Sequence, residues 1–185
     1  ALNHEDIVEW ILERQRNVGW ATVDLILRGL FAGMNDERRT ATLNLAVQKL
    51  RDQDLVSAIP DLLVNAPFVP DTWKRLESMD SRARDSYWAS VVPGFGRLGR
   101  EDMSTAVEQL MKQGRACSAF RLVMYKPEHV DPIVLKDMLD AIRSDAEPGE
   151  KFPEGWHIAN AIQAIEASGQ ISRRDLAMLE FAFFR

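Results

Sequence analysis

The residues with the clearest potential for chemistry form a glycine-rich segment, GFGRLG at residues 94–99, which matches the pattern G-x-G-x-x-G. In a dinucleotide site, such glycines let the backbone approach a pyrophosphate at the N-terminus of a helix. That site also needs a strand before the glycines and an acidic residue at the end of the next strand. Here Pro93 interrupts a preceding segment that is typical of a short helix, and Ala-Phe-Arg at residues 119–121 occupies the place of the acid. We therefore expect a loop between helices, and we predict no cofactor.

The three histidines do not have the spacing of metal ligands. His4, His129 and His157 each lack a second histidine or cysteine three or four residues away, the spacing that places two ligands on one helical face. Glu128 and Asp131 flank His129, so a metal site or an acid–base pair would need a further group from another element. The alternative is a solvated turn whose acids cap the next helix, and this alternative predicts no metal ligand and no catalytic residue.

The single cysteine, Cys117, excludes an internal disulfide. A nucleophilic thiol needs a base and an accessible, electropositive pocket. Arg115 and Arg121 supply positive charge nearby, but no histidine is close in the sequence. We therefore expect Cys117 to be a buried thiol on a helix of small residues.

Arginines and aromatic residues alternate between residues 73 and 100. Such a mixture suits stacking on single-stranded nucleic acid, but Trp, Tyr and Arg are also the usual anchors of protein interfaces. The acids in the same segment and a formal net charge of -5 disfavour a general polyanion partner. A protein contact is therefore the leading hypothesis, although the same aromatic spacing fits two short core helices. The predicted partner-binding residues, which include one from the last helix, are Trp73, Arg75, Arg82, Arg84, Trp88, Arg97, Arg100 and Phe184.

The elements that position these residues are all predicted to be helices, because apolar residues recur at helical spacing and strand signals are scarce. Asn3, Asn35, Asp71, Asp131 and Ser172 are predicted to cap helix N-termini. Gly33 and Gly169 are predicted as left-handed stops, and Pro60 indicates either a kink or two short helices. The predicted helices span about 4–15, 19–32, 36–51, 54–65, 72–79, 81–91, 101–113, 115–125, 132–144, 155–168 and 173–184.

This succession of short helices and short loops resembles irregular helical-repeat regions of the HEAT or tetratricopeptide-like type. The resemblance covers most of the chain but rests on the rhythm of helices, since the Trp-Leu-Gly-Tyr signature of tetratricopeptide repeats is absent. It implies an all-α fold in which antiparallel helix pairs stack as a short α-solenoid. A compact irregular helical bundle is the alternative.

The sequence favours one helical-repeat domain over residues 1–185, with a possible sub-boundary in the loop region 92–100. The final run, LEFAFFR, is apolar and has no stop signal after it, so we expect a fragment of a longer protein. We expect Leu179 and Phe183 to pack on the 155–168 helix and Phe184 to face outward. No apolar run is long enough to span a bilayer, and cytoplasm is the default compartment.

The predicted function is protein–protein interaction or scaffolding within a larger multidomain protein, with no enzymatic activity of its own. The partner would be another protein or other domains of the parent chain. One alternative is an accessory or regulatory domain of an enzyme, with a site assembled from distant residues such as Glu128, His129, Asp131 and Arg121. Another is a nucleic-acid contact through residues 73–100.

Overall fold

The computed structural model describes residues 3–18, 20–94, 98–144 and 153–184, and no strand occurs among them. The prediction of an all-α fold is confirmed. Contacts divide the chain into two compact units, Ala1–Val92 (unit 1) and Pro93–Arg185 (unit 2), which we describe separately. The prediction of a single repeat domain within a longer protein stays a prediction.

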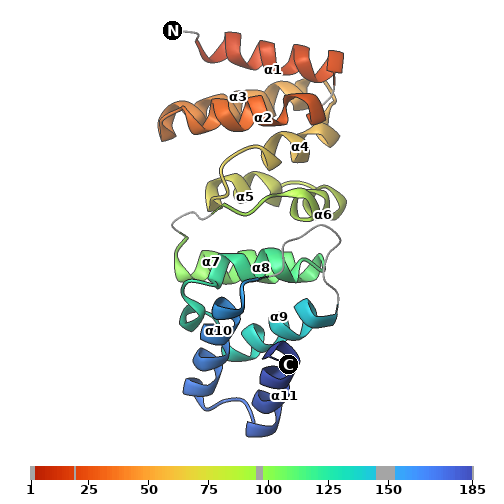
Figure 1. Ribbon diagram of the computed structural model, residues 1–185. Helices are drawn as coiled ribbons and strands as arrows, with labels where there is room; N and C mark the ends of the chain where they lie inside the picture. Colours follow the sequence, from red (N-terminus) through yellow and green to blue (C-terminus); the bar gives the residue numbers. More distant parts are fainter. Residues whose placement is uncertain (1–2, 19, 95–97, 145–152, 185) are drawn as a thin grey trace. The chain divides into compact units, whose positions relative to one another are not determined.

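Unit 1 is a succession of helices that pack mainly on neighbours in the sequence. The helix α1 packs on α2 and α3, and α4 packs on α6 (Figure 1). The bounds are α1 His4–Val18, α2 Trp20–Ala32, α3 Asp36–Asp52, the 3₁₀ turn η1 Val56–Ala58, α4 Ile59–Val64, α5 Pro70–Glu77 and α6 Ser81–Ser90. Its largest fully buried side chains are Ile11, Leu27, Phe31, Leu50, Ile59, Leu62, Leu63, Leu76 and Tyr87.

Unit 2 is also a succession of helices that pack mainly on neighbours in the sequence. The helix α8 packs on α7 and α9, and α10 packs on α9 and α11 (Figure 1). The bounds are α7 Arg100–Lys112, α8 Ala116–Val123, the 3₁₀ turn η2 Pro127–His129, α9 Pro132–Ser144, α10 Gly155–Ser168 and α11 Arg173–Phe184. The core includes Leu110, Phe120, Leu135, Leu139, Ile142 and Ile165, all buried.

Side-chain caps explain why the predicted helix starts agree closely with the structure. Asn3 and Asp6 form a reciprocal capping box, with 2.8 Å from the Asp6 N–H to Asn3 Oδ1 and 3.2 Å in the other direction. Asn35 Oδ1 accepts from the Arg38 N–H at 2.9 Å. Asp131 Oδ1 accepts from the Ile133 N–H at 2.8 Å, just before Pro132 begins α9. These groups satisfy backbone donors that have no partner within the helix.

Two of the predicted helix signals are wrong, at Gly33 and at Asp71. The helix α2 ends at Ala32, close to the predicted end, but Gly33 does not have a positive φ, and its N–H donates to the Gly29 carbonyl at 3.1 Å. Among the described residues, the left-handed glycines are Gly114 and the predicted stop Gly169, at φ 71° and 65°. Asp71 does not cap α5, because the helix already begins at Pro70, whose ring fixes a helical φ at the first position.

Of the two interpretations of Pro60, a kink or two short helices, the structure agrees with the second. The 3₁₀ turn η1 ends at Ala58, and Pro60 lies in the first turn of α4. A proline costs little there, because the first N–H groups of a helix have no intrahelical acceptor. The chain therefore keeps Pro60 without a kink inside a helix.

Candidate functional site

The two tryptophans predicted to contact a partner are core residues of unit 1. Trp73 and Trp88 are only 8% and 5% exposed. Their ring centroids lie 5.4 Å apart, and Phe68 meets them edge-on at 5.0 and 6.0 Å. The predicted partner contact would need exposed rings, but the helices turn both tryptophans toward this aromatic cluster. The alternative interpretation of the same spacing, two short core helices, is the correct one.

The arginines of the 73–100 segment differ in their surroundings. Arg75 is partly buried and donates to Asn44 Oδ1 from Nε at 3.1 Å and from Nη2 at 2.9 Å. Burial lowers the pKa of its guanidinium, and the charge of Asp71 opposes that shift. Arg82 and Arg84 are exposed on α6, whereas Arg97 lies outside the described residues. Their binding role stays a prediction.

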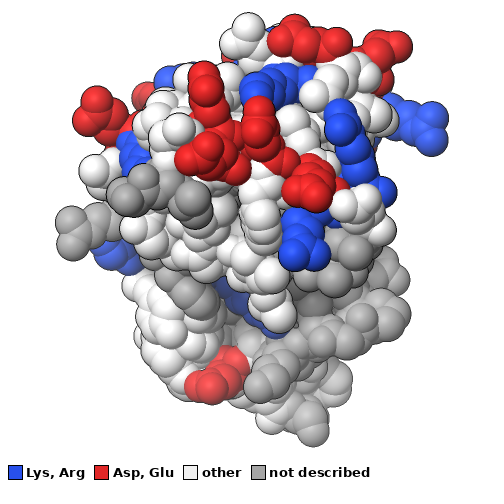
Figure 2. Space-filling model, turned by 90° about the horizontal axis from the view of Figure 1, so that it is seen from above, with Lys and Arg blue, Asp and Glu red and all other residues white. Residues whose placement is uncertain are grey.

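The nucleic-acid hypothesis loses most of the rings it needed for stacking. Trp73, Tyr87 and Trp88 are buried, and Phe95 lies outside the described residues. Bases stack on exposed aromatic faces, so buried rings provide no platform. Figure 2 shows, on the side of unit 1 that carries α1, acidic and basic side chains interspersed instead of one basic surface. Lys49 is 3.5 Å from Glu9 there, so part of the positive charge is paired.

A buried polar cluster in unit 1 was missed by sequence reasoning. Asn65, 3% exposed at the end of α4, accepts from Arg28 Nε at 3.0 Å and donates to Asp24 Oδ1 at 2.7 Å. Burial, and then the charge of Asp24, raise the pKa of the nearby Asp61. Every polar atom of the Asn65 amide has a partner, so the cluster joins α2 to α4 and is structural. No local pattern could reveal it, because Asp24 and Asn65 are 41 residues apart.

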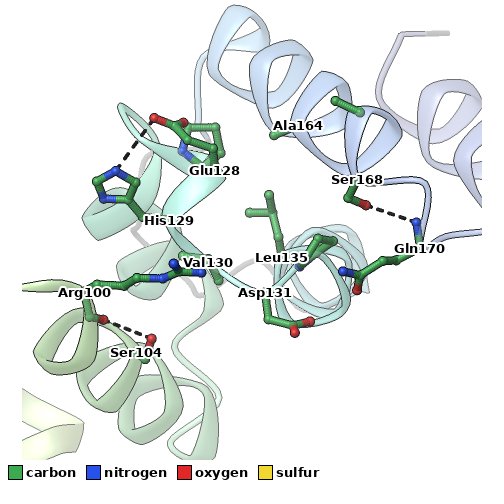
Figure 3. Close-up of a pocket in the computed structure, with 13 residues that line it drawn as sticks. Arg100, Ser104, Glu128, His129, Val130, Asp131, Leu135, Ala164, Ser168 and Gln170 are labelled. Carbon is green, nitrogen blue, oxygen red and sulfur yellow. Dashed lines mark hydrogen bonds and ion pairs between the residues drawn. The ribbon is translucent and has the colours of Figure 1, made fainter.

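Unit 2 brings together most of the residues of the predicted composite site. Glu128, His129 and Asp131 line an open pocket of about 480 Å³, which we call the His129 pocket (Figure 3). The predicted Arg121 does not line it, and Arg100 at the start of α7 reaches toward Val130 in its place. The end of α10 closes the other side with Ala164, Ala167 and Ser168, followed by Gln170. Four separate elements therefore contribute, which the sequence alone does not indicate.

The geometry of the His129 pocket suits binding better than proton transfer. His129 Nε2 and Glu128 Oε1 are 4.0 Å apart, and the side chains are 41% and 64% exposed. A general acid–base pair works within hydrogen-bond reach and gains strength from exclusion of water. Asp131 is already used as the cap of α9. Within the described part of the chain, no group of three or more histidine, cysteine or acidic residues is arranged to hold a metal ion.

The candidate nucleophile Cys117 and the histidine His157 are both buried. Cys117 is 2% exposed, as expected for a core thiol. His157 is 5% exposed, and its ring lies 4.9 Å from that of Tyr125 and 3.5 Å from that of Trp156. Both residues contribute to packing in unit 2.

An apolar groove lies between α7 and α9 in unit 2, with a volume of about 560 Å³. Its apolar lining consists of Val107, Met111, Val130 and Val134. Its charged lining consists of Glu108, Lys112, Asp131 and Asp137. We call this feature the α7–α9 groove. It shares Ser104, Val130 and Asp131 with the His129 pocket, so the two hollows adjoin.

Large apolar side chains are exposed just after α8 and on α10 and α11 of unit 2. Tyr125 and Trp156 are 64% and 51% exposed, with ring centroids 6.2 Å apart. A Cβ placed on Gly155, the residue before Trp156, would lie 4.0 Å from the Phe184 ring. Met178 and Phe181 recur at intervals of three residues before Phe184 and are also exposed. We call these residues the aromatic face: Tyr125, Trp156, Met178, Phe181 and Phe184.

In α11, Leu179 is buried and Phe184 is 53% exposed, which agrees with the expected inward and outward positions. The helix packs on α10 and also on α9, so the expected contact of Leu179 with α10 itself stays a prediction. Phe183 is only partly buried. Helical periodicity predicts the inward position of Leu179, because it points away from the side of the helix that carries the exposed Phe181 and Phe184.

Among the described residues, no helix combines the length and the apolar character needed to cross a membrane.

Known proteins give no further guide to the function of these surfaces. No family model matches the chain, and neither curated proteins nor solved structures provide a significant match.

Proposed function

We propose that the protein is a protein-interaction or scaffolding module, and that unit 2 makes the principal contact through its aromatic face. The observation that carries this proposal is the exposure of Tyr125, Trp156, Met178, Phe181 and Phe184 within one unit. Soluble proteins rarely expose large apolar side chains in a group unless another surface covers them. Tyrosine and tryptophan are also the residues that most often dominate binding energy at interfaces.

The proposed architecture is an irregular α-solenoid in one domain of a longer protein. It is supported by short helices whose contacts are mostly with neighbours in the sequence. A repeat array buries each apolar helix face against the next pair, so an apolar face that no other helix covers is available to a partner. The partner is therefore another protein or another part of the parent chain.

A photo-crosslinking phenylalanine analogue at Phe184 is expected to trap the partner in cells that express the protein. The side chain is 53% exposed, so the analogue fits without disturbing the core. The matched control places the same analogue at Gln163, which is exposed on α10 and outside the aromatic face. Discrete crosslinked products are expected from position 184 only, analysed by denaturing gel and mass spectrometry.

A double variant, Phe181→Ala with Phe184→Ala, tests quantitatively whether the aromatic face binds the partner. Both residues are exposed, so stability should change by only about 0.5 kcal/mol per site. Affinity for the crosslinked partner should fall at least about tenfold, as expected for interface anchors. Equal crosslinking at positions 163 and 184, or unchanged affinity, would show that the aromatic face is not the contact.

The His129 pocket favours a second candidate function, an accessory or regulatory domain that binds a small polar ligand. Its volume of about 480 Å³ is in the usual range of ligand sites, and charges of both signs line it. On this hypothesis His129→Ala lowers ligand-dependent activity of the parent assembly about tenfold, while Lys126→Ala, an exposed change outside the pocket, has no effect. Unchanged regulation in the His129 variant would eliminate this function.

A further inference from the structure

The α7–α9 groove is open because both of its walls pack on a third helix. The helices α7 and α9 each pack on α8, and the hollow lies between them. Val107 and Val130 are buried at its base, whereas Val134 on the α9 wall is 37% exposed. Along α7 the lining runs from Ser104 to Lys112, about 12 Å at 1.5 Å per residue. This length matches two turns of a bound helix.

The charges at the groove have one predominant sign. Glu108 and Lys112 form an ion pair at 2.8 Å, so the lysine charge is offset within the wall. The carboxylates of Asp131 and Asp137, both exposed residues, remain. Three carboxylates and one ammonium therefore line an apolar cleft. Exposed charges of this kind contribute little to stability, but they select partners and accelerate association.

We propose that the α7–α9 groove binds a helical segment of another protein whose apolar anchors are flanked by lysine or arginine. Amphipathic helices bind such grooves through anchors spaced i, i+3 and i+7, with charges at the edges setting specificity. Anionic lipid and nucleic acid have the wrong sign for the acidic edge. A second copy of this chain, with a formal net charge of -5, is disfavoured for the same reason.

This inference goes beyond the proposed function, because the groove and the aromatic face share no residue. The two surfaces can therefore be tested separately. Variants at Phe181 and Phe184 should leave groove binding unchanged, and variants at the groove should leave the crosslink at position 184 unchanged. A failure of one proposal is then distinguishable from a failure of the other.

The test uses the 185-residue protein and fluorescence anisotropy with a labelled model helix. The probe has about 12 residues, with leucines at i, i+3 and i+7 and lysines on the other face. Two matched probes replace the lysines with glutamate or glutamine. The lysine probe is expected to bind at least about tenfold more tightly than the glutamate probe, with the difference shrinking as salt is added.

Variants of the protein locate the binding to the groove. Val134→Glu should weaken the lysine probe at least about tenfold, because it places a carboxylate against the leucine anchors. Ile133→Glu is the matched control, since Ile133 is exposed on α9 but does not line the groove, and binding should change less than about twofold. Asp137→Asn should weaken the lysine probe and spare the glutamine probe, whereas Glu166→Gln on α10 should affect neither.

The outcomes that overturn the proposal are specific. They are no binding of the lysine probe, equal affinity for the lysine and glutamate probes, or equal effects of the substitutions at positions 133 and 134. Sedimentation velocity of the wild type and of Val134→Glu measures self-association, and so tests whether a second copy of this chain occupies the groove. Self-association that Val134→Glu abolishes would assign the groove to a second copy and would also overturn the proposal. Circular dichroism confirms that each variant is folded, and Asp137→Asn provides an independent test if Val134→Glu is not.

Discussion

Replacing Trp88 with alanine is expected to destabilise unit 1 by about 4 kcal/mol. Trp88 is 5% exposed, and its ring contacts those of Phe68, Trp73 and Tyr87 at centroid distances of 6.0, 5.4 and 5.2 Å. The substitution removes the transfer free energy of an indole and leaves a cavity that the surrounding rings cannot fill without leaving their rotamers. The tilted and edge-on ring contacts add to this loss.

Urea unfolding followed by circular dichroism measures the effect of Trp88→Ala. The matched control is Val92→Ala, which lies just after α6 but is 57% exposed, so its effect should stay within about 0.5 kcal/mol. If the two units unfold in separate transitions, only the transition of unit 1 should shift. A Trp88→Phe variant should keep part of the stability that Trp88→Ala loses. A Trp88→Ala effect as small as that of the control would contradict the buried aromatic cluster and restore Trp88 as a surface residue.

The sequence predicted the helices closely because the signals that start and end a helix are local. Asn3 with Asp6, Asn35 and Asp131 all cap helices through residues two or three positions away. Their contributions depend on backbone geometry that the flanking residues determine. At Gly33 the predicted end of the helix is correct but the predicted left-handed conformation is not, because a left-handed glycine is common after a helix but not required.

The sequence pattern did not reveal which aromatic residues are exposed. Trp88 and Trp156 both lie on helices, yet Trp88 is 5% exposed and Trp156 is 51% exposed. The difference depends on which helices pack against each face, and residues outside each helix determine those contacts. For the same reason, sequence analysis found Glu128, His129 and Asp131 as a local group but missed Arg100 as their neighbour. The α7–α9 groove has no local signature, since two helices contribute its walls.

Stability is also expected to fall steeply above about pH 10, through the ionisation of Tyr87. Burial raises the pKa of Tyr87 far above its ordinary value, and the nearby Trp73 indole N–H, which favours the phenolate, offsets only part of this shift. Tyr87 is fully buried, and its hydroxyl meets no partner with standard hydrogen-bond geometry among the described residues. The folded protein therefore keeps the phenol protonated, whereas the unfolded chain releases that proton near pH 10.

Tyr87→Phe should remove this component, because phenylalanine has no proton to lose. Above about pH 10 the unfolded state binds fewer protons than the folded state, so stability declines with rising pH by up to about 1.4 kcal/mol per unit. The chain contains two tyrosines, and Tyr125, 64% exposed, provides the matched control. Urea unfolding between about pH 9 and about pH 11.5 compares the three proteins, with background from lysine titration common to all. The stability of Tyr125→Phe should follow that of the wild type, and the stability of Tyr87→Phe should decline less steeply with rising pH. Parallel stability curves for all three proteins would place Tyr87 in contact with water.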